Sequence, residues 1–150
     1  MRAGVARRRG LGNAHWPARF EILSHEPLVL YDGGHNPEGV AAAAASIGTY
    51  FAGQKVNLLM GVMKDKNYVV MTKTLAPLAN KVYTVTPENP RSLPAKELAA
   101  CFRNGQAYAT VKEGLSAAIA ASKNEGRPLV CLGSLYLYPE VRKALFEIVS

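Results

Sequence analysis

The stretch PLVLYDGGHNPEGVAAAAASIGTYFAG, residues 27–53, carries a complete strand, turn and helix signal. It begins with a compact apolar run, PLVLYD, which is typical of a buried strand. The polar turn that follows reaches Asn36, which suits the N-cap of a helix, while Pro37 suits the first helical position and Glu38 the positive helix end. The alanines favour a helix, and Gly53 is placed to close it. The stretch therefore predicts one strand–turn–helix unit.

The same alternation continues along the chain. The segment 19–24 alternates in polarity and only two residues separate it from the strand at 27–32, so a hairpin or a sharp corner is expected there. Further strands are expected at 55–62, 81–87, 106–111 and 128–134. Further helices are expected at 67–79 (capped by Asn67, with Pro77 disturbing the last turn), 92–104, 112–126 and 139–149. The pattern predicts an α/β fold, a three-layer Rossmann-like domain whose mixed, mostly parallel sheet has about six strands, one of them antiparallel, flanked by helices.

The length of 150 residues suits one domain. The formal net charge is +7, but four of the 18 basic residues fall within the first nine positions. We interpret residues 1–15 as a basic tail or linker remnant and residues 16–150 as the domain. A nucleic-acid-binding protein would show a basic stripe interleaved with aromatic residues, or a recognisable module, and the sequence has neither. Nucleic acid is therefore not an expected partner, whereas an anionic small-molecule substrate agrees with the charge.

The chain has no run of 18 apolar residues and no apolar signal core at its N-terminus, so neither a membrane span nor secretion is expected. Cys101 and Cys131 lie far apart, match no metal-ligand spacing and have apolar neighbours. We expect both to be buried free thiols, which indicates a reducing compartment. The expectation is a cytoplasmic monomer with no metal ligands in this chain.

The turn at the end of the first long strand, Asp32-Gly33-Gly34-His35, is the first candidate site. Ligands of open α/β sheets bind beyond the carboxyl ends of the strands. The glycines permit positive φ and close approach to a ligand, and the helix start suits an anion. Asp32 suits ribose hydroxyls better than a polyphosphate, and His35 suits a second substrate with a carboxylate, as a donor or proton acceptor. A capped turn without any ligand explains every one of these residues except His35.

Three other turns carry polar side chains. Arg19 in WPARFE follows a rigid Trp-Pro entry, and its planar guanidinium suits phosphate, although a plain surface charge also explains it. Ser134 and Tyr136 follow directly on a buried strand, where the edge of a core is the alternative interpretation. The charged loop 64–66 after Gly61 is more typical of a solvent-exposed loop than of a site.

Taken together, the turns WPARFE, DGGHNP, GVMKDKN, NPRSLP and GSLYL occur in an order that resembles the C-terminal domain of folylpolyglutamate synthase/dihydrofolate synthase. That family belongs to the Mur-ligase-like superfamily of ATP-dependent amide ligases, and its usual pattern is W-P-G-R, D-G-A-H-N-P, a D-K loop and G-S-x-Y. The resemblance covers about residues 16–148. Ala18 and Gly34 stand where the family more often has glycine and alanine, a small residue for a small one in each case.

The resemblance implies an α/β domain and a reaction in which ATP phosphorylates a folate or pteroate carboxylate, which the α-amine of L-glutamate then attacks. By position, Arg19 is similar to the family arginine that reaches the ATP phosphates across the domain cleft. Asp32 is similar to the acid that binds the nucleotide. His35, Ser134 and Tyr136 are similar to the residues on the glutamate side, with His35 in a catalytic role.

One departure from the family is large. The ATPase domain of such ligases carries a G-x-x-G-K-[ST] phosphate loop, whereas none of the 13 glycines here is followed by lysine. The Mg²⁺ ligands also belong to that domain. We therefore expect the chain to be a detached C-terminal glutamate ligase domain whose partners are the N-terminal ATPase domain of the same ligase, ATP, folate or dihydropteroate, and L-glutamate. The isolated domain is expected to be inactive.

Two alternatives stay open on the sequence. The first is the corresponding domain of another Mur-type ligase, against which the pairing of WPARFE with GSLYL favours the folate branch. The second is a non-catalytic module that binds a nucleotide or an amino acid. Lys66 and Arg91 receive no role in any of these interpretations.

Overall fold

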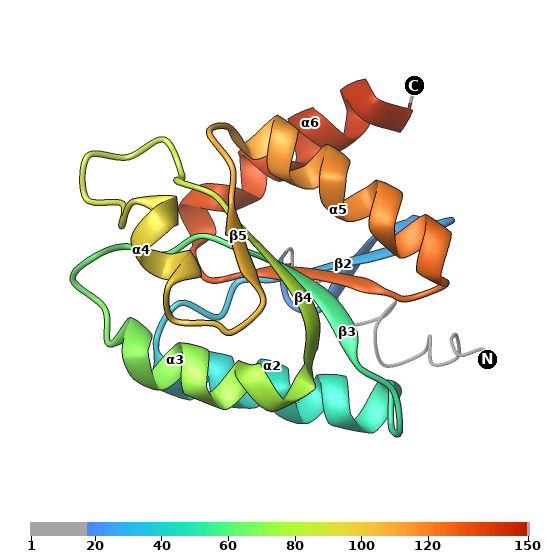
Figure 1. The fold of residues 1–150 in the computed structure, drawn as a ribbon, viewed down its shortest axis with the longest axis horizontal. Coiled ribbons are helices and arrows are strands. Elements are labelled where there is room, and N and C mark those ends of the chain that lie inside the picture. The colour runs from blue at the N-terminus through green and yellow to red at the C-terminus, as the bar shows by residue number, and fades with distance from the viewer. Residues whose placement is uncertain (1–17, 150) are drawn as a thin grey trace.

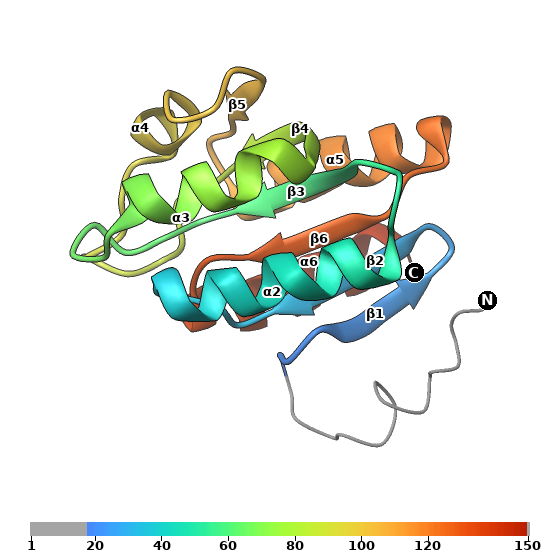
Figure 2. The ribbon, with the colours of Figure 1, turned by 90° about the horizontal axis from the view of Figure 1, so that it is seen from below.

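The computed structural model describes residues 18–149, and these form a six-stranded sheet between two layers of helices (Figures 1 and 2). The strand order is β1-β2-β6-β3-β4-β5. The strands are β1 (Glu21–His25), β2 (Leu28–Asp32), β3 (Val56–Met60), β4 (Ala79–Thr84), β5 (Gly105–Ala107) and β6 (Leu129–Leu132). Only β1 and β2 pair in the antiparallel direction, and the other four pairings are parallel. The predicted mixed α/β sheet and its first hairpin are confirmed.

The five α-helices of the described chain are α2 (Pro37–Tyr50), α3 (Tyr68–Leu75), α4 (Ala95–Ala99), α5 (Val111–Glu125) and α6 (Tyr138–Val149). Figure 1 shows α2 and α3 on one face of the sheet and α5 and α6 on the other. Successive strand residues point to opposite faces, so Leu58 and Met60 pack with α2 and α3 while Leu59 packs with α5 and α6. Both faces of the central strands are therefore buried, which explains their continuous apolar sequences.

The helix starts follow the sequence signals closely. The side chain of Asn36 accepts a hydrogen bond from Gly39 N at 2.8 Å, and Pro37 occupies the first turn. Asn67 accepts from Val70 N at 3.5 Å, and Pro77 lies in a separate 3₁₀ turn after α3. Gly53 does have a positive φ of 82°, but it lies beyond Phe51, which is the residue that ends α2.

Three expectations were wrong in detail. The helix expected at 92–104 is reduced to α4, because Pro94 takes the N-cap position and the chain turns again after Ala99. The strand expected at 106–111 is only the short β5, because the side chain of Thr110 already caps α5. Cys131 is buried as expected, whereas Cys101 is only partly buried in the turn after α4; both are free thiols.

Because β2, β6, β3, β4 and β5 are parallel, their carboxyl ends lie along one side of the sheet, which we call the carboxyl edge. The antiparallel β1 begins at that same edge, with Glu21 opposite Tyr31. The opposite side, where the parallel strands begin, is the amino edge. In residues 18–149, none of the helices has the length and apolar character needed to cross a bilayer.

Candidate functional site

The carboxylate of Asp32 joins two loops of the carboxyl edge, the one before β1 and the one after β2, by hydrogen bonds. Its Oδ1 accepts a hydrogen bond from Gly34 N at 2.8 Å, and its Oδ2 accepts one from Phe20 N at 3.1 Å. The residue is only 8% exposed. Burial raises the pKa of this carboxyl, and the two N–H groups and the charge of Arg19 oppose that rise. Asp32 thus fixes the loop before β1 against the turn after β2.

The two glycines of that turn serve the packing of the chain against itself. Neither has a positive φ, contrary to one of the two reasons that the sequence suggested for them. A Cβ on Gly33 would lie 2.6 Å from the side chain of Leu135, and one on Gly34 would lie 2.8 Å from Gly39 O. The turn is therefore tightly closed, and an alanine in place of Gly34, the more common residue in the resembled family, would need a local shift.

Left-handed backbone occurs instead on both sides of Arg19. Ala18 has a φ of 63° and Phe20 a φ of 49°, a region that residues with a side chain rarely adopt. Three hydrogen bonds hold this turn: Ala18 N donates to Glu21 Oε1 at 2.7 Å, Gly33 N donates to Ala18 O at 2.5 Å, and Phe20 N donates to Asp32. Arg19 itself is exposed. The replacement of glycine by Ala18 is thus more than a change of size, because it places a Cβ on left-handed backbone.

His35 follows directly and is partly buried. Its Nδ1 lies 3.1 Å from Gly33 O. A carbonyl oxygen can only accept a hydrogen bond, so in the neutral tautomer that makes this contact Nδ1 carries the proton and Nε2 the lone pair.

Ser134 and Tyr136 come from the chain that follows β6. Ser134 is 1% exposed; its Oγ accepts a hydrogen bond from Tyr136 N at 3.0 Å, and its carbonyl accepts one from Tyr31 OH at 2.5 Å. Tyr136 is 49% exposed. The serine hydroxyl therefore caps the 3₁₀ turn Leu135–Leu137 that presents the tyrosine side chain.

The five side chains predicted from sequence thus lie on three loops that hydrogen bonds join into one unit. Gly33 N bonds to Ala18 O, and Gly133 N bonds to Gly34 O at 3.1 Å. The loop after β3 adjoins the same unit, because Gly61 O would collide with a Cβ on Gly133. Lys64 and Asp65 are exposed and Lys66 is partly buried, and Asp65 pairs with Arg91 at 3.5 Å. The tail at 1–15 and the Trp16-Pro17 entry lie outside the described residues.

The arrangement suits an anionic ligand better than a metal ion. Residues 18–149 contain no group of three or more His, Cys, Asp and Glu side chains placed to hold a metal. Asp32 is the only carboxylate of the turn after β2, and both of its oxygens already accept backbone N–H groups. A single carboxylate does not by itself supply the near-octahedral oxygen coordination that Mg²⁺ needs. The exposed guanidinium of Arg19, by contrast, fits phosphate oxygens.

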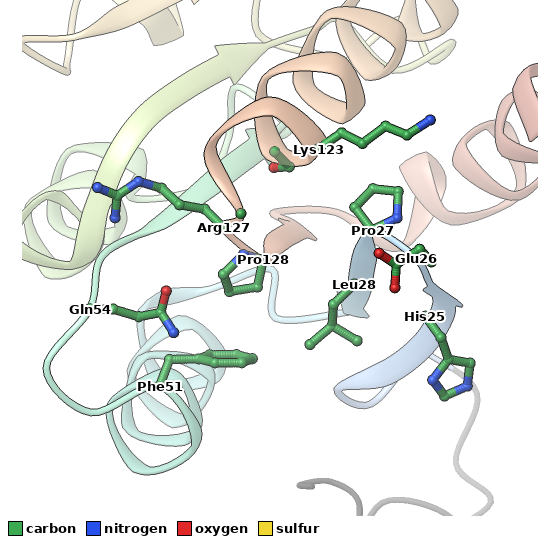
Figure 3. Close-up of a pocket in the computed structure, with 11 residues that line it drawn as sticks. His25, Glu26, Pro27, Leu28, Phe51, Gln54, Lys123, Arg127 and Pro128 are labelled. Carbon is green, nitrogen blue, oxygen red and sulfur yellow. The ribbon is translucent and has the colours of Figure 1, made fainter. Parts of the chain in front are cut away.

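A cavity of about 280 Å³ lies at the amino edge, far from these loops (Figure 3). Phe51, Leu28 and Pro128 face its middle, whereas the charged ends of Lys123 and Arg127 extend away from it. Arg127 instead donates to Lys55 O at 2.9 Å. The floor of the cavity is apolar, and the polar residues His25, Glu26, Gln54 and Ser122 also line it.

Comparison with known proteins gives matches over most of the chain. The family model of the Mur ligase glutamate ligase domain matches residues 18–135. The chain is 36% identical to folylpolyglutamate synthase of Lacticaseibacillus casei over 141 residues, which cover 92% of this chain and 32% of that protein. It is 31% identical to dihydrofolate synthase/folylpolyglutamate synthase of Bacillus subtilis, covering 93% of this chain and 33% of that protein. The chain thus spans about a third of the length of these curated relatives.

Among solved structures, Escherichia coli FolC in complex with DHPP and ADP superposes with a TM-score of 0.83 at 26% identity. The match covers 97% of this chain and 35% of that one. The sheet and helices described above are therefore those of a domain found within longer ligases.

Proposed function

The chain belongs to the family of Mur ligase glutamate ligase domains, in the form found in folylpolyglutamate synthase/dihydrofolate synthase, and from this premise we propose that it is the C-terminal domain of an ATP-dependent ligase that adds L-glutamate to folate. The observation that carries the proposal is the placement of Arg19, Asp32, His35, Ser134 and Tyr136 on three linked loops at the carboxyl edge. An arginine, a carboxylate and a histidine there supply groups for a nucleotide and for an amino acid.

The proposed reaction forms an amide in two steps. A carboxylate oxygen of folate, or of dihydropteroate, attacks the γ-phosphorus of ATP, so that an acyl phosphate forms and ADP leaves. The α-amine of L-glutamate then attacks the acyl carbon, an N–C bond forms, the C–O bond to phosphate breaks, and the amine loses a proton. The products are the amide, ADP and phosphate.

On the nucleotide side we assign Arg19 and Asp32. Arg19 is exposed, always charged and has a planar fork of N–H donors for phosphate oxygens. Asp32 keeps acceptor capacity, because a carboxylate offers about four lone-pair positions and two of them take Gly34 N and Phe20 N. The remaining positions suit the two hydroxyls of a ribose.

On the glutamate side we assign His35, Ser134 and Tyr136. The hydrogen bond of His35 Nδ1 to Gly33 O leaves Nε2 as the acceptor, which is the form required to take a proton from the attacking amine. Tyr136 is exposed on the loop after β6, and the Ser134 hydroxyl caps the turn that carries Tyr136. We infer that these residues orient the glutamate carboxylates while His35 accepts the proton.

The remaining machinery is proposed to lie in an N-terminal ATPase domain of the same ligase, which would supply the phosphate loop and hold Mg²⁺ between the phosphates. This agrees with the fraction of the relatives that the chain spans and with the absence of a metal cluster from residues 18–149. We therefore propose that the domain alone does not turn over, and that the ligase works in the cytoplasm, where ATP and folates are supplied.

The test is steady-state kinetics on the enzyme encoded by the complete reading frame, measured as ATP-dependent incorporation of labelled glutamate. Arg19→Ala is expected to raise the apparent KM for ATP by roughly ten- to a hundredfold, the equivalent of one charged hydrogen bond. Arg103→Ala is the matched control, since Arg103 is an exposed arginine beyond α4, next to the start of β5. An unchanged KM for ATP in the Arg19 variant would contradict the assignment.

The glutamate side is tested by His35→Ala, with His25→Ala at the amino edge as its control. We expect the first variant to lower kcat/KM for glutamate by at least tenfold and the second to leave it within twofold. Unchanged glutamate kinetics in the His35 variant would refute its role. Measurable turnover by the 150-residue chain alone would refute the need for a second domain.

A further inference from the structure

We propose that Glu21 and Tyr138 are positioning residues that fix the direction of the Arg19 side chain. The inference rests on the proposed role of Arg19 as a phosphate ligand, and it extends the site to two residues that the sequence did not single out. The observation behind it is a chain of contacts that runs from α6 to the turn around Arg19.

One carboxylate oxygen forms the centre of this chain of contacts. Glu21 Oε1 accepts a hydrogen bond from Ala18 N at 2.7 Å and another from Tyr138 OH at 2.6 Å. Glu21 is the first residue of β1 and Tyr138 the first residue of α6. The bond joins elements that are 117 positions apart in sequence. A carboxylate with two donors on one oxygen is held in direction as well as in place.

Tyr138 is itself fixed by its neighbours. Its ring packs edge-on against Tyr31, with centroids 5.0 Å apart and planes at 71°. Arg142 lies 5.7 Å from the ring centroid and donates to the hydroxyl at 3.5 Å. Burial and the adjacent Glu21 carboxylate raise the pKa of Tyr138, so the hydroxyl remains a donor above neutral pH. The hydroxyl is thus presented to Glu21 by a rigid ring.

The turn needs this support because of its backbone. Ala18 and Phe20 both lie in the left-handed region, which a residue with a Cβ adopts only when its surroundings impose it. Each of their N–H groups is bound by a carboxylate, Ala18 N by Glu21 and Phe20 N by Asp32. Arg19 is the residue between them. If Glu21 is lost, Ala18 can relax to ordinary φ values, and the peptide that sets the direction of Arg19 rotates with it.

A purely structural role for Glu21, as an anchor for the start of β1, makes a different prediction. An anchor would affect stability and both substrates alike, and it would act independently of the guanidinium. A positioning residue acts only through Arg19. A double-mutant cycle between the two side chains separates these roles.

The experiment uses the full-length ligase with Glu21→Ala, Arg19→Ala and the double variant. We expect Glu21→Ala to raise the KM for ATP about tenfold, to leave the KM for glutamate within twofold, and to have no further effect in the Arg19→Ala background. Glu21→Gln, which keeps an acceptor oxygen, should stay within about threefold of the wild type. Tyr138→Phe should raise the KM for ATP by about threefold, since it removes one of the two donors. Glu147→Ala, which removes a carboxylate paired with Lys112, is the control.

Two outcomes would overturn the inference while leaving the proposed function intact: additive effects of Glu21→Ala and Arg19→Ala, or an equal rise of both KM values. A silent Arg19→Ala would instead contradict the proposed function. A readout that needs no activity is amide hydrogen exchange of the 150-residue chain. Glu21→Ala should remove the protection of the Ala18 amide while Glu147→Ala preserves it; wild-type protection of Ala18 in the Glu21 variant would also overturn the inference.

Discussion

The two edges of the sheet are stabilised by different kinds of hydrogen bond. At the amino edge, side chains bond mainly to one another: Asn57 Nδ2 donates to Ser122 Oγ and to Glu125 Oε1, both at 3.1 Å, and Asn80 donates to Asn57 Oδ1 at 3.0 Å. At the carboxyl edge, the carboxylates of Glu21 and Asp32 bond to backbone N–H groups. In the first network the polar side chains are hydrogen-bonded to one another. In the second the carboxylates fix the backbone, and the guanidinium of Arg19 stays exposed.

This difference indicates that the amino edge mainly stabilises the fold, whereas the carboxyl edge has groups left to bind a ligand. A network that satisfies its own members stabilises the strand ends and has little capacity left for a ligand. A carboxylate that accepts hydrogen bonds from backbone N–H groups fixes the backbone of its neighbours. The side chains of those neighbours then have a fixed direction but remain free to bind a ligand. The two edges should therefore respond differently to the same kind of change, and the following experiments test that expectation.

The largest contrast is expected between two glycines with positive φ. Gly133, at the carboxyl edge, has a φ of 118° and its added Cβ would collide with Gly61 O, whereas Gly126, after α5, has a φ of 67° and open space around it. Gly133→Ala should lower the free energy of unfolding by about 3 kcal/mol or more, since it adds steric overlap to backbone strain. Gly126→Ala should lower it by only about 1–2 kcal/mol. Urea unfolding of both variants measures the difference, and equal losses would contradict it.

The next effect concerns the amino-edge network. Asn57 is fully buried, and its side chain also accepts a hydrogen bond from Lys81 N at 3.2 Å. Asn57→Ala should lower the free energy of unfolding by about 2–3 kcal/mol, because it leaves buried partners unsatisfied. In the full-length ligase both KM values should stay within twofold of the wild type. Asn124→Ala, on the exposed surface of α5, is the control. A changed KM for ATP would show that the edges are coupled.

A smaller effect of opposite sign is expected at Ala18. Replacing it by glycine removes the Cβ from left-handed backbone but adds freedom to the unfolded chain, so Ala18→Gly should raise the free energy of unfolding by about 0.5–1 kcal/mol. The same change at Ala42, an exposed position of α2, should lower it by about 1 kcal/mol. Thermal and urea unfolding distinguish the two signs. Destabilisation at Ala18 would mean that the turn is not strained.

The smallest effect is on pH dependence, and its sign differs between the edges. Burial raises the pKa of Asp32 above 3.8, so its contribution to stability is present below pH 3.8 and is lost as the pH rises through the folded-state pKa. Hydrogen bonds from Lys81 and Asn57 lower the pKa of Glu125 below 4.5, so its contribution is present above pH 4.5 and is lost as the pH falls through the folded-state pKa.

Unfolding titrations between pH 3 and 7 test this pair of signs. Relative to the wild type, Asp32→Asn should remove a loss of stability with rising pH, and Glu125→Gln should remove a loss with falling pH. The difference in unfolding free energy between each variant and the wild type should change with pH in opposite directions for the two variants. Changes of the same sign would contradict the explanation by burial at Asp32 and by charge pairing at Glu125.

The sequence predicted the features that are local. Asn36 and Pro37 mark the start of α2 by themselves, and Pro77 marks the end of α3. The position of Asp32, His35, Ser134 and Tyr136 at one edge followed from a general rule about parallel sheets, whereas Arg19 lies there because the antiparallel β1 begins at that edge. The shortening of α4 was missed, although Pro94 in its expected range was a usable signal, because proline does not continue a helix from the preceding turn.

What the sequence did not reveal depends on contacts between distant residues. The bond of Asp32 to Phe20 N and that of Glu21 to Tyr138 join loops whose meeting only the folded sheet decides. The left-handed turn around Arg19 carries no glycine, so nothing in the local sequence announces it. Glu21, the last residue of WPARFE, is visible in the sequence. Its two hydrogen-bond donors, Ala18 N and Tyr138 OH, are brought to it only by the fold.

The position of β6 has a consequence for how the protein is made. This strand is the last of the six in the chain, yet it lies between β2 and β3 and provides the hydrogen bonds that join them. Until a ribosome has released residues 129–132, the β1–β2 pair and the β3–β4–β5 group have no shared ladder, and the inner sides of the almost wholly buried β2 and β3 remain open. The sheet can therefore close only after residues 129–132 have been made, and until then the exposed edges of β2 and β3 invite aggregation and chaperone binding.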